Sequence, residues 1–181
     1  MQPQLYRPHG PQVNISLARV LTGGWKICYK GSHAEIDAII DTDVQDIEDS
    51  KCRGSNIMMA CGRDNNSDVP ATLQLLAWAP REVVFNHTSD KGEVSMGTRF
   101  YRTWTSYPWT SSRYGVWGFN GGNTTDRGQT GGACDNQTED AQIRLCWQPS
   151  ALSYTLSGWR CGEIQSLSRK PQWKRIIFES D

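Results

Sequence analysis

The sequence predicts a mainly β protein, a disulfide-stabilised β-sandwich or open barrel of about eight or nine short strands with one α-helix over about residues 33–49. Short strand-like runs recur along the 181-residue chain, and its seventeen glycines indicate many turns between them. A tryptophan lies beside or near a cysteine at Trp25, Trp147 and Trp159. Because a tryptophan packed on a disulfide is a common centre for a small β-domain, we expect these runs to build the core.

Cysteine usage predicts three disulfides and an oxidising compartment. The chain has six cysteines and no Cys-x-x-Cys pair, which weakens zinc and thioredoxin-like interpretations. The pairing is left open among Cys28, Cys52, Cys61, Cys134, Cys146 and Cys161. The alternative is a cytosolic protein with six buried free thiols.

Glycosylation acceptor sequences indicate the same compartment. Asn-x-Ser/Thr occurs at five of the eight asparagines, whereas the Ser and Thr content would give roughly one by chance. The acceptors are Asn14, Asn65, Asn86, Asn123 and Asn136. Part of the excess could arise from polar loop composition. The pattern predicts a glycosylated protein of a eukaryotic secretory pathway, located outside the cell or at its surface.

Charge and hydropathy narrow the expected partners. Lys plus Arg and Asp plus Glu both total 19, so no net charge draws the chain to nucleic acid or to an anionic membrane. No apolar run is long enough for membrane insertion. The N-terminus lacks the basic and apolar regions of a secretory signal, so we expect that a signal peptide is absent from this numbering.

Residues 1–23 differ in composition from residues 24–181, which predicts an extended N-terminal arm followed by a single disulfide-rich β-domain. Residues 13–21 alternate and predict a strand. Its apolar face carries Val13, Ile15, Leu17 and Leu21. The glycines that follow would act as a hinge. This strand is either the first strand of the domain or a donor strand that completes the sheet of a neighbouring subunit.

The predicted helix begins at a capping box formed by Ser32 and Glu35. Apolar residues then recur at helical spacing, at Ile36, Ile39, Ile40, Val44 and Ile47. The other face carries Asp37, Asp41, Asp43, Asp46, Glu48 and Asp49. We interpret it as a solvated acidic face, because the run lacks the glycine and the spacing of an EF-hand calcium loop.

The remaining strands are predicted from short apolar runs. Residues 71–78 and 81–85 are expected to form a hairpin, and residues 86–97 a loop. Residues 120–140 are the longest irregular stretch, which Cys134 should tether. The other predicted strands lie at 25–30, 56–60, 98–105, 114–119, 141–147, 154–161 and 173–178.

The sequence contains no recognisable catalytic or cofactor motif. Its three histidines, His9, His33 and His87, are not spaced as metal ligands, and there is no nucleophile elbow or phosphate-binding loop. We therefore expect no metal, no cofactor and no enzyme activity. A hydrolase whose two carboxylates are brought together by the fold stays an alternative.

Aromatic residues between positions 100 and 120 are the candidate ligand contacts. Exposed Trp and Tyr rings can stack on sugar faces. The candidate glycan contacts are Tyr107, Trp109 and Tyr114, and Trp109 is favoured because it follows a proline in a predicted loop. We interpret Trp104 and Trp117 as core residues.

These features predict an extracellular glycosylated structural protein. In this hypothesis it is a self-assembling subunit of a filament or surface layer, joined to other copies of itself by N-terminal strand addition. Full burial of each apolar arm side chain would contribute about 1.5–3 kcal/mol. The alternative is a carbohydrate-binding or adhesion module whose aromatic surface contacts glycans.

Overall fold

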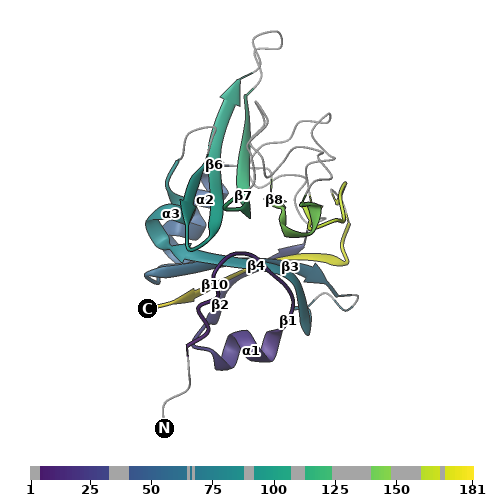
Figure 1. Cartoon of the computed structure of the whole chain (residues 1–181). Helices are drawn as coiled ribbons and strands as arrows, with labels where there is room; N and C mark the ends of the chain where they lie inside the picture. The colour runs from purple at the N-terminus through teal and green to yellow at the C-terminus, as the bar shows by residue number, and fades with distance from the viewer. Residues whose placement is uncertain are drawn as a thin grey trace.

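The structure is a computed structural model. It describes residues 5–32, 41–64, 66, 68–87, 92–106, 113–123, 140–147, 160–167 and 170–181, with the side chains of 41–43, 103–106 and 113–116 left out. Two five-stranded antiparallel sheets make up most of this part of the chain (Figure 1). Within these ranges no helix is long and apolar enough to cross a membrane.

The first sheet, sheet A, has the strand order β1-β4-β3-β10-β2. Its strands are β1 (Gln12–Ser16), β4 (Thr72–Pro80), β3 (Asn56–Arg63), β10 (Trp173–Ser180) and β2 (Lys26–Ser32). The C-terminal strand β10 lies between β3 and β2, so the two ends of the chain belong to the same sheet.

The second sheet, sheet B, follows the chain in the order β5-β6-β7-β8-β9. Its strands are β5 (Glu93–Ser95), β6 (Thr98–Ser106), β7 (Arg113–Gly121), β8 (Leu145–Trp147) and β9 (Arg160–Cys161). The long pair β6 and β7 stays in one register from Thr98 opposite Gly121 to Ser106 opposite Arg113. Consecutive antiparallel strands of this kind need only short connections.

Sheets A and B enclose the main core. The long strands β6 and β7 of sheet B run up the page in Figure 1 while β3, β4 and β10 run across it, so the two sheets cross each other. Sheet B contributes mostly aromatic side chains, and the rings of Trp117 and Trp147 meet edge to face with centroids 5.4 Å apart. The Cys61–Cys161 disulfide joins β3 to β9 and so links the two sheets.

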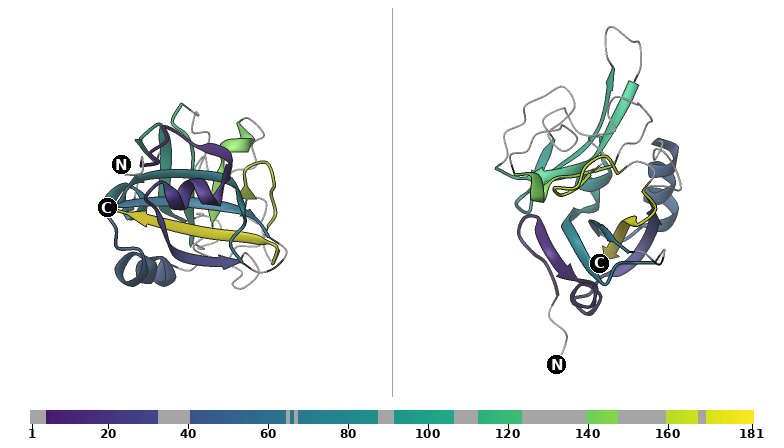
Figure 2. Two further views of the ribbon diagram at one scale, coloured as in Figure 1. Left: turned by 90° about the horizontal axis from the view of Figure 1, so that it is seen from below. Right: turned by 90° about the vertical axis from the view of Figure 1, so that its right-hand side faces the viewer.

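A second, smaller core lies on the opposite face of sheet A, and we call it the outer core. Alternate residues of β3 serve the two cores, since Ile57 and Met59 pack in the main core and Met58 and Ala60 in the outer core. The outer core is covered by the beginning of the chain, including the helix α1 (Leu17–Thr22), which lies over the strands in Figure 2. The central strands of sheet A, β3, β4 and β10, are therefore buried on both faces.

The strand predicted at residues 13–21 is confirmed only in its first part, as β1, and the prediction is wrong for the part that forms α1. The Oγ of Ser16 accepts the backbone N–H of Arg19 at 3.2 Å and so caps the start of α1. Val20, one turn after Leu17, is fully buried in the outer core. Leucines and valines at this spacing suit a helix as well as a strand, and the cap decides between them.

The predicted helix at residues 33–49 is confirmed in the part that the structure describes. The helix α2 (Asp41–Asp46) continues directly as a π-helix, η1 (Ile47–Lys51), and residues 33–40 lie outside the described residues. Val44 and Ile47 are buried, as the apolar spacing predicts.

Residues 81–85 form a helix, α3 (Arg81–Phe85), so the predicted second strand of a hairpin is wrong. Val83, Val84 and Phe85 are all buried, and a strand with one buried face cannot bury three consecutive side chains. The guanidinium of Arg81 donates to the backbone oxygens of Glu48 and Cys52. These bonds attach α3 to the end of η1.

The mainly β sandwich that the sequence predicts is confirmed, with differences in detail. The described residues contain ten strands and three short α-helices. β5 lies in the segment predicted as a loop, and the strand predicted at 141–147 begins instead with a 3-10 turn, η2 (Ala141–Ile143). The strand predicted at 154–161 is described only where it forms β9.

Candidate functional site

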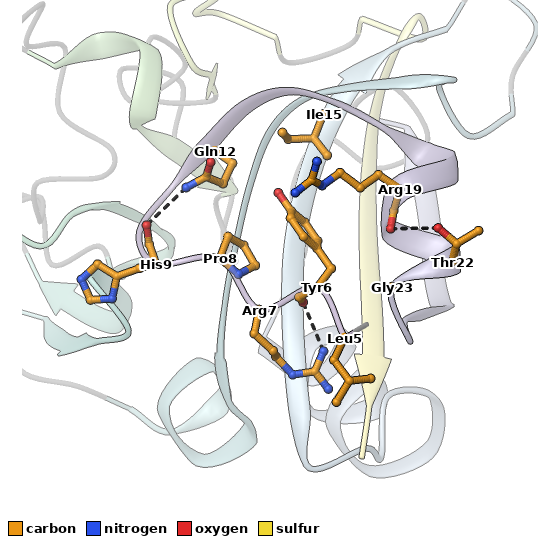
Figure 3. Close-up of a pocket in the computed structure, with 10 residues that line it drawn as sticks. All are labelled: Leu5, Tyr6, Arg7, Pro8, His9, Gln12, Ile15, Arg19, Thr22 and Gly23. Carbon is orange, nitrogen blue, oxygen red and sulfur yellow. Dashed lines mark hydrogen bonds between the residues drawn. The ribbon is translucent and has the colours of Figure 1, made fainter. Parts of the chain in front are cut away.

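The beginning of the chain lies against the outer core instead of projecting from the domain. Residues 5–22, which we call the N-terminal segment, arch over sheet A, join its edge as β1 and return as α1 (Figures 1 and 3). The backbone N–H of Tyr6 donates to the oxygen of Gly23 at 2.8 Å. The segment therefore starts and ends at the same place on the sheet.

Two tryptophans from the rest of the chain hold the backbone of the N-terminal segment. Trp25 Nε1 donates to the oxygen of Tyr6 at 2.7 Å, and Trp78 Nε1 donates to the oxygen of Pro8 at 2.8 Å. The two indoles meet edge to face, with their centroids 6.0 Å apart. Both indole N–H groups thus donate to one stretch of main chain, in the way that a peptide-binding site donates to the backbone of an extended peptide.

The guanidinium of Arg7 lies against the same two indoles. Its Cζ is 4.6 Å from the ring centroid of Trp25 and 5.5 Å from that of Trp78, which is cation–π geometry. One terminal nitrogen also donates to Ser180 Oγ at 2.9 Å. Burial lowers the pKa of this guanidinium from its ordinary value, because the charged form loses water on docking.

Tyr6 fixes the two ends of the N-terminal segment to each other. Its ring lies under the guanidinium of Arg19 on α1, with Cζ 4.9 Å from the centroid. Burial raises the pKa of the Tyr6 phenol, and the nearby positive charge of Arg19 opposes part of this rise. The hydroxyl is buried and makes no hydrogen bond within the described part of the chain.

Two glycines end the N-terminal segment. A Cβ added to Gly23 would lie 2.4 Å from Tyr6 Cβ and 2.8 Å from the oxygen of Arg19, so only glycine lets the segment close against itself. Gly24 has a φ of +97°, a conformation that side-chain-bearing residues rarely adopt. The predicted hinge therefore coincides with a tight turn at the exit of α1.

The rest of the N-terminal segment is attached through its backbone. β1 pairs with β4 of the same chain, with Gln12 opposite Leu76 and Ser16 opposite Thr72. Two further bonds follow the same edge, from the N–H of Leu17 to Ala71 O at 2.8 Å and from the N–H of Gly10 to Met96 O at 2.7 Å. The second bond reaches sheet B, so the segment bridges the two sheets.

An open groove lies between the first residues of the N-terminal segment and the residues on and after α1. Figure 3 draws the residues that line it. Its charged side chains are those of Arg7 and Arg19, and no Asp, Glu or Cys occurs among the described residues of the lining. The lining also contains the imidazole of His9 and the phenol of Tyr6.

The four predicted arm residues fall into two groups. Ile15 and Leu17 pack against the outer core, whereas Val13 and Leu21 are each 42% exposed. The predicted common face does not form, because Asn14 between Val13 and Ile15 has a φ of 55°, which interrupts the extended strand, and because α1 rotates Leu21 relative to β1. Val20 takes the buried position instead.

The cysteines form disulfides, as predicted, wherever the structure describes them. The pairs are Cys28–Cys52 and Cys61–Cys161, and no described cysteine is free. Cys146 is also disulfide-bonded. Cys134 lies outside the described residues.

Three of the predicted glycosylation acceptors can be placed. Asn14, Asn86 and Asn123 are all exposed. The first lies on β1, the second follows α3 and the third follows β7. Asn65 and Asn136 lie outside the described residues. The placed acceptors are thus accessible to a glycan without any change of the fold.

The candidate glycan contacts cannot be joined into a site. Tyr107 and Trp109 lie outside the described residues, and Tyr114 belongs to β7 at a position where only the backbone is described. Trp117, which we interpreted as a core residue, is 1% exposed.

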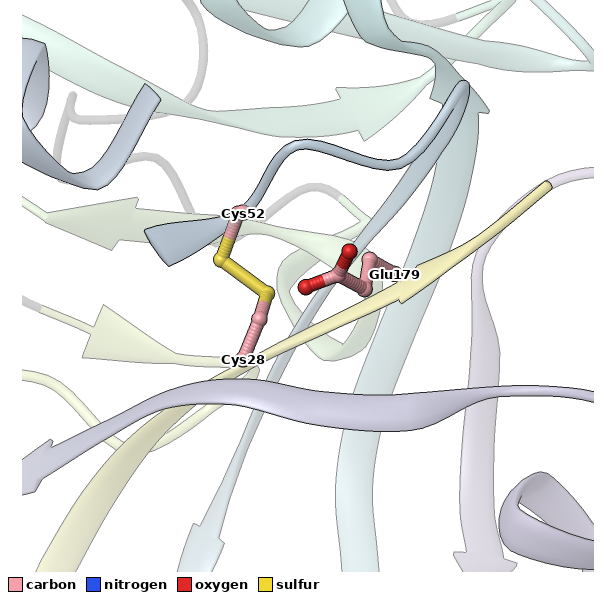
Figure 4. Close-up of side chains that lie close together, drawn as sticks. All are labelled: Cys28, Cys52 and Glu179. Atoms are coloured by element: carbon pink, nitrogen blue, oxygen red, sulfur yellow. A yellow bond between two sulfur atoms is a disulfide. The ribbon is translucent and has the colours of Figure 1, made fainter. Parts of the chain in front are cut away.

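One group of potential metal ligands occurs in the part of the chain that can be searched. Cys28, Cys52 and Glu179 each place a ligand atom within 4.8 Å of the others (Figure 4). The two cysteines are bonded to each other, so in this oxidised form only the carboxylate is available as a donor.

The residues that hold the N-terminal segment were missed by sequence reasoning. Tyr6, Arg7 and Pro8 stand in a proline-containing stretch expected to be poorly packed, and their partners Trp25 and Trp78 are far away in sequence. The only available signal was the need of each indole N–H for an acceptor, which does not say where the acceptor is. No protein-family model, curated protein or solved structure matches this chain.

Proposed function

We propose that this protein is an extracellular, N-glycosylated structural subunit that assembles into a filament or surface layer by exchanging its N-terminal segment between copies. In the assembled form, the segment of one copy would occupy the outer core and the β4 edge of the next copy. The observation that carries this proposal is the way in which Trp25 and Trp78 hold residues 6–8 as a bound peptide.

Exchange would conserve the contacts of the N-terminal segment. Its bonds to Trp25, Trp78, Ala71, Met96 and Ser180 all reach residues that every copy possesses. The same bonds can therefore form between two chains, and the hinge is the only place where the conformation must change. If each copy donates to the next without reciprocal return, the assembly is open-ended.

The buried side chains define how strongly a donated segment would be held. Val20 is fully buried, and Ile15, Leu17 and Tyr6 are partly buried against the outer core. Complete burial of one such side chain contributes about 1.5–3 kcal/mol. An exposed outer core would carry an apolar face with two tryptophans, which favours its occupation by a segment from one copy or another.

Support for the extracellular location comes from the disulfides and from the exposed acceptor asparagines. Disulfides form and persist in oxidising compartments and are rare in the cytosol. Asn14, Asn86 and Asn123 are accessible where the structure describes them. Both features suit a secreted protein that meets other copies of itself outside the cell.

The decisive experiment introduces a cysteine pair across β1 and β4. Ser16 and Thr72 lie opposite each other and are both exposed, so Ser16→Cys with Thr72→Cys should form a bond when the native protein is oxidised. We would mix isotopically labelled and unlabelled copies during refolding and analyse the cross-linked peptides by mass spectrometry. Exchange predicts peptides with mixed labels and a covalent ladder on a non-reducing gel.

The single variants Ser16→Cys and Thr72→Cys are the matched controls. One added cysteine can join only two chains, so neither control should exceed a covalent dimer. If the double variant gives only peptides in which both halves carry the same label, the segment stays in its own chain and the proposed assembly is wrong.

A second measurement compares the mass in solution of the full chain with that of a chain lacking residues 1–22, by light scattering. The proposal predicts large species for the full chain and a monomeric or unstable truncated chain. Well-folded monomers in both cases would contradict it. The glycan-binding alternative would then be tested by sugar-dependent quenching of tryptophan fluorescence in the native chain and in Trp109→Ala.

A further inference from the structure

We infer that Cys28, Cys52 and Glu179 form a latent site for a soft divalent cation such as Zn²⁺, which becomes available when the Cys28–Cys52 disulfide is reduced. The three ligand atoms lie within 4.8 Å of one another (Figure 4). Thiolates and carboxylates are both donors to Zn²⁺, and three protein ligands with one water are a common set. All three residues belong to one chain, so the site is independent of assembly.

A β-bulge places the first of the two sulfurs. On β10, Ile177 pairs with Tyr29 of β2, whereas the next residue, Phe178, pairs with Ile27. Cys28 is therefore the extra residue of a bulge, and a bulge redirects the side chain that it carries. Its Sγ lies 3.4 Å from the oxygen of Ile177, beside β10.

The second sulfur and the carboxylate come from separate elements. Cys52 follows directly after η1, and its backbone N–H donates to the oxygen of Ile47 at 2.7 Å, which fixes the end of that helix. Glu179 lies near the end of β10, and Figure 4 shows its carboxylate close to the disulfide. Two of the three ligands thus lie on neighbouring strands of sheet A, which hold ligand geometry better than loops, and the third is fixed at the end of η1.

Glu179 is only partly exposed and places its carboxylate beside the disulfide. Within the described residues this carboxylate makes no hydrogen bond or ion pair, and the bonded sulfurs carry no hydrogen to donate to it. A cation bound to both sulfurs would place a positive charge beside this partly buried carboxylate.

Opening of the site requires a dithiol reductant. One thiolate of the reductant attacks the Cys28 sulfur, the bond to Cys52 breaks, and Cys52 leaves as a thiolate. The second thiol of the reductant then displaces Cys28, so the reductant becomes a disulfide and two electrons pass to the protein. When the cation binds, the protons remaining on the two thiols are released to solvent.

The chain contains a disulfide that should resist the same treatment. Cys61 and Cys161 are both 0% exposed in the main core, whereas Cys28 is partly exposed on the edge strand β2. A reductant can therefore reach the Cys28 sulfur first, because exchange depends on access to the sulfur that is attacked. Mild reduction should open the site while the connection between the sheets stays closed.

The test uses the full native chain and Co²⁺ as a spectroscopic probe. The protein is treated briefly with a dithiol, freed of reductant without air and titrated with Co²⁺. We expect one Co²⁺ per chain, a thiolate charge-transfer band in the near ultraviolet, and displacement of the Co²⁺ by Zn²⁺. Alkylation and peptide mapping should show Cys28 and Cys52 as the reduced pair.

Two variants decide which residues bind the cation. Cys28→Ser with Cys52→Ser should abolish the band, and Glu179→Gln should weaken binding by about tenfold or more, since even outer-shell changes lower metal affinity by about 10–100-fold. Unchanged affinity in Glu179→Gln would remove the carboxylate from the site. Loss of near-ultraviolet circular dichroism on mild reduction, or failure of this disulfide to open in the folded chain, would overturn the inference.

Discussion

Arg7 combines a stacking contact with a hydrogen bond on one half-buried side chain. Its guanidinium lies against Trp25 and Trp78 and also donates to Ser180. Cation–π contacts are worth about 0.5–1 kcal/mol when exposed and about 2 kcal/mol when desolvated. This residue therefore connects the N-terminal segment to three distant parts of the chain.

We predict that Arg7→Ala lowers the free energy of unfolding by about 1–2 kcal/mol, because both the ring contacts and the bond to Ser180 are lost. Arg7→Lys should recover part of the loss, since an ammonium keeps the charge but not the planar stacking. Urea unfolding followed by tryptophan fluorescence measures the stability of both variants.

Arg63→Ala, at an exposed arginine of β3, is the control and should change the free energy of unfolding by less than about 0.5 kcal/mol. Equal losses in Arg7→Ala and Arg63→Ala would contradict the role of Arg7.

Tyr6 makes the attachment of the N-terminal segment sensitive to alkaline pH. Burial raises the pKa of Tyr6 above its ordinary value of 10.0. Its neutral phenol therefore stabilises the docked form fully below that value, and the stabilisation is lost as the pH rises toward the raised pKa. We predict that the fluorescence of Trp25 and Trp78 reports release of the segment on alkaline titration.

Tyr6→Phe is the matched variant for this titration. It should remove the alkaline step and leave the protein as stable as before or about 1 kcal/mol more stable, because the buried hydroxyl has no hydrogen-bond partner among the described residues. A titration step of the same size in Tyr6→Phe would show that another group controls release.

Among the elements, the two disulfides whose cysteines are both described constrain different parts of the fold. Cys61–Cys161 joins the two sheets across a sequence separation of 100 residues, whereas Cys28–Cys52 joins β2 to the end of η1 across 24 residues. A longer closed loop restricts the unfolded chain more strongly. Chain entropy alone gives about 4.7 kcal/mol for the long loop and about 3.5 kcal/mol for the short one.

We predict that replacing Cys61 and Cys161 by alanine destabilises the protein more than replacing Cys28 and Cys52. The larger effect has two sources, the longer loop and the complete burial of both sulfurs in the main core. Equilibrium urea unfolding of the two double variants measures the order. A smaller loss for the Cys61 and Cys161 variant would mean that packing holds the sheets together without the covalent link.

For the whole molecule, the exposed acceptor on the sheet edge would connect the proposed glycosylation with the proposed assembly. Asn14 lies on β1, the edge strand of sheet A, with a φ of 55° and an exposed side chain. An uncovered edge strand can pair with the edge of another molecule. A glycan at Asn14 would hinder such lateral pairing and leave the exchange of the N-terminal segment as the route of association.

We predict that each of three variants, when secreted from eukaryotic cells, is lighter than the native chain by the mass of one glycan and still folds. The variants are Asn86→Gln, Asn123→Gln and Asn14→Asp. Asp is chosen at position 14 because it tolerates the left-handed backbone there. Mass spectrometry before and after enzymatic deglycosylation counts the glycans, and light scattering of Asn14→Asp tests for added lateral association. Unchanged masses in all three variants would contradict the proposed glycosylation.

Local patterns in the sequence determined the class of this fold and the presence of disulfides. Short apolar runs predicted most strands, because such a run is visible in any few residues, as in residues 56–60 and 173–178. The even cysteine count predicted disulfides because pairing depends on compartment and number, whereas the partners of Cys28 and Cys61 depend on distances that no spacing rule contains.

Tertiary structure alone decided the rest. Residues 81–85 are helical although their composition suits a strand, and the bonds of Arg81 to a distant helix end hold this helix in place. The candidate site was hidden for the same reason. Tyr6 and Trp25 become neighbours of Trp78 only after sheet A has formed, so the hold on the N-terminal segment is a product of long-range packing rather than of any local pattern.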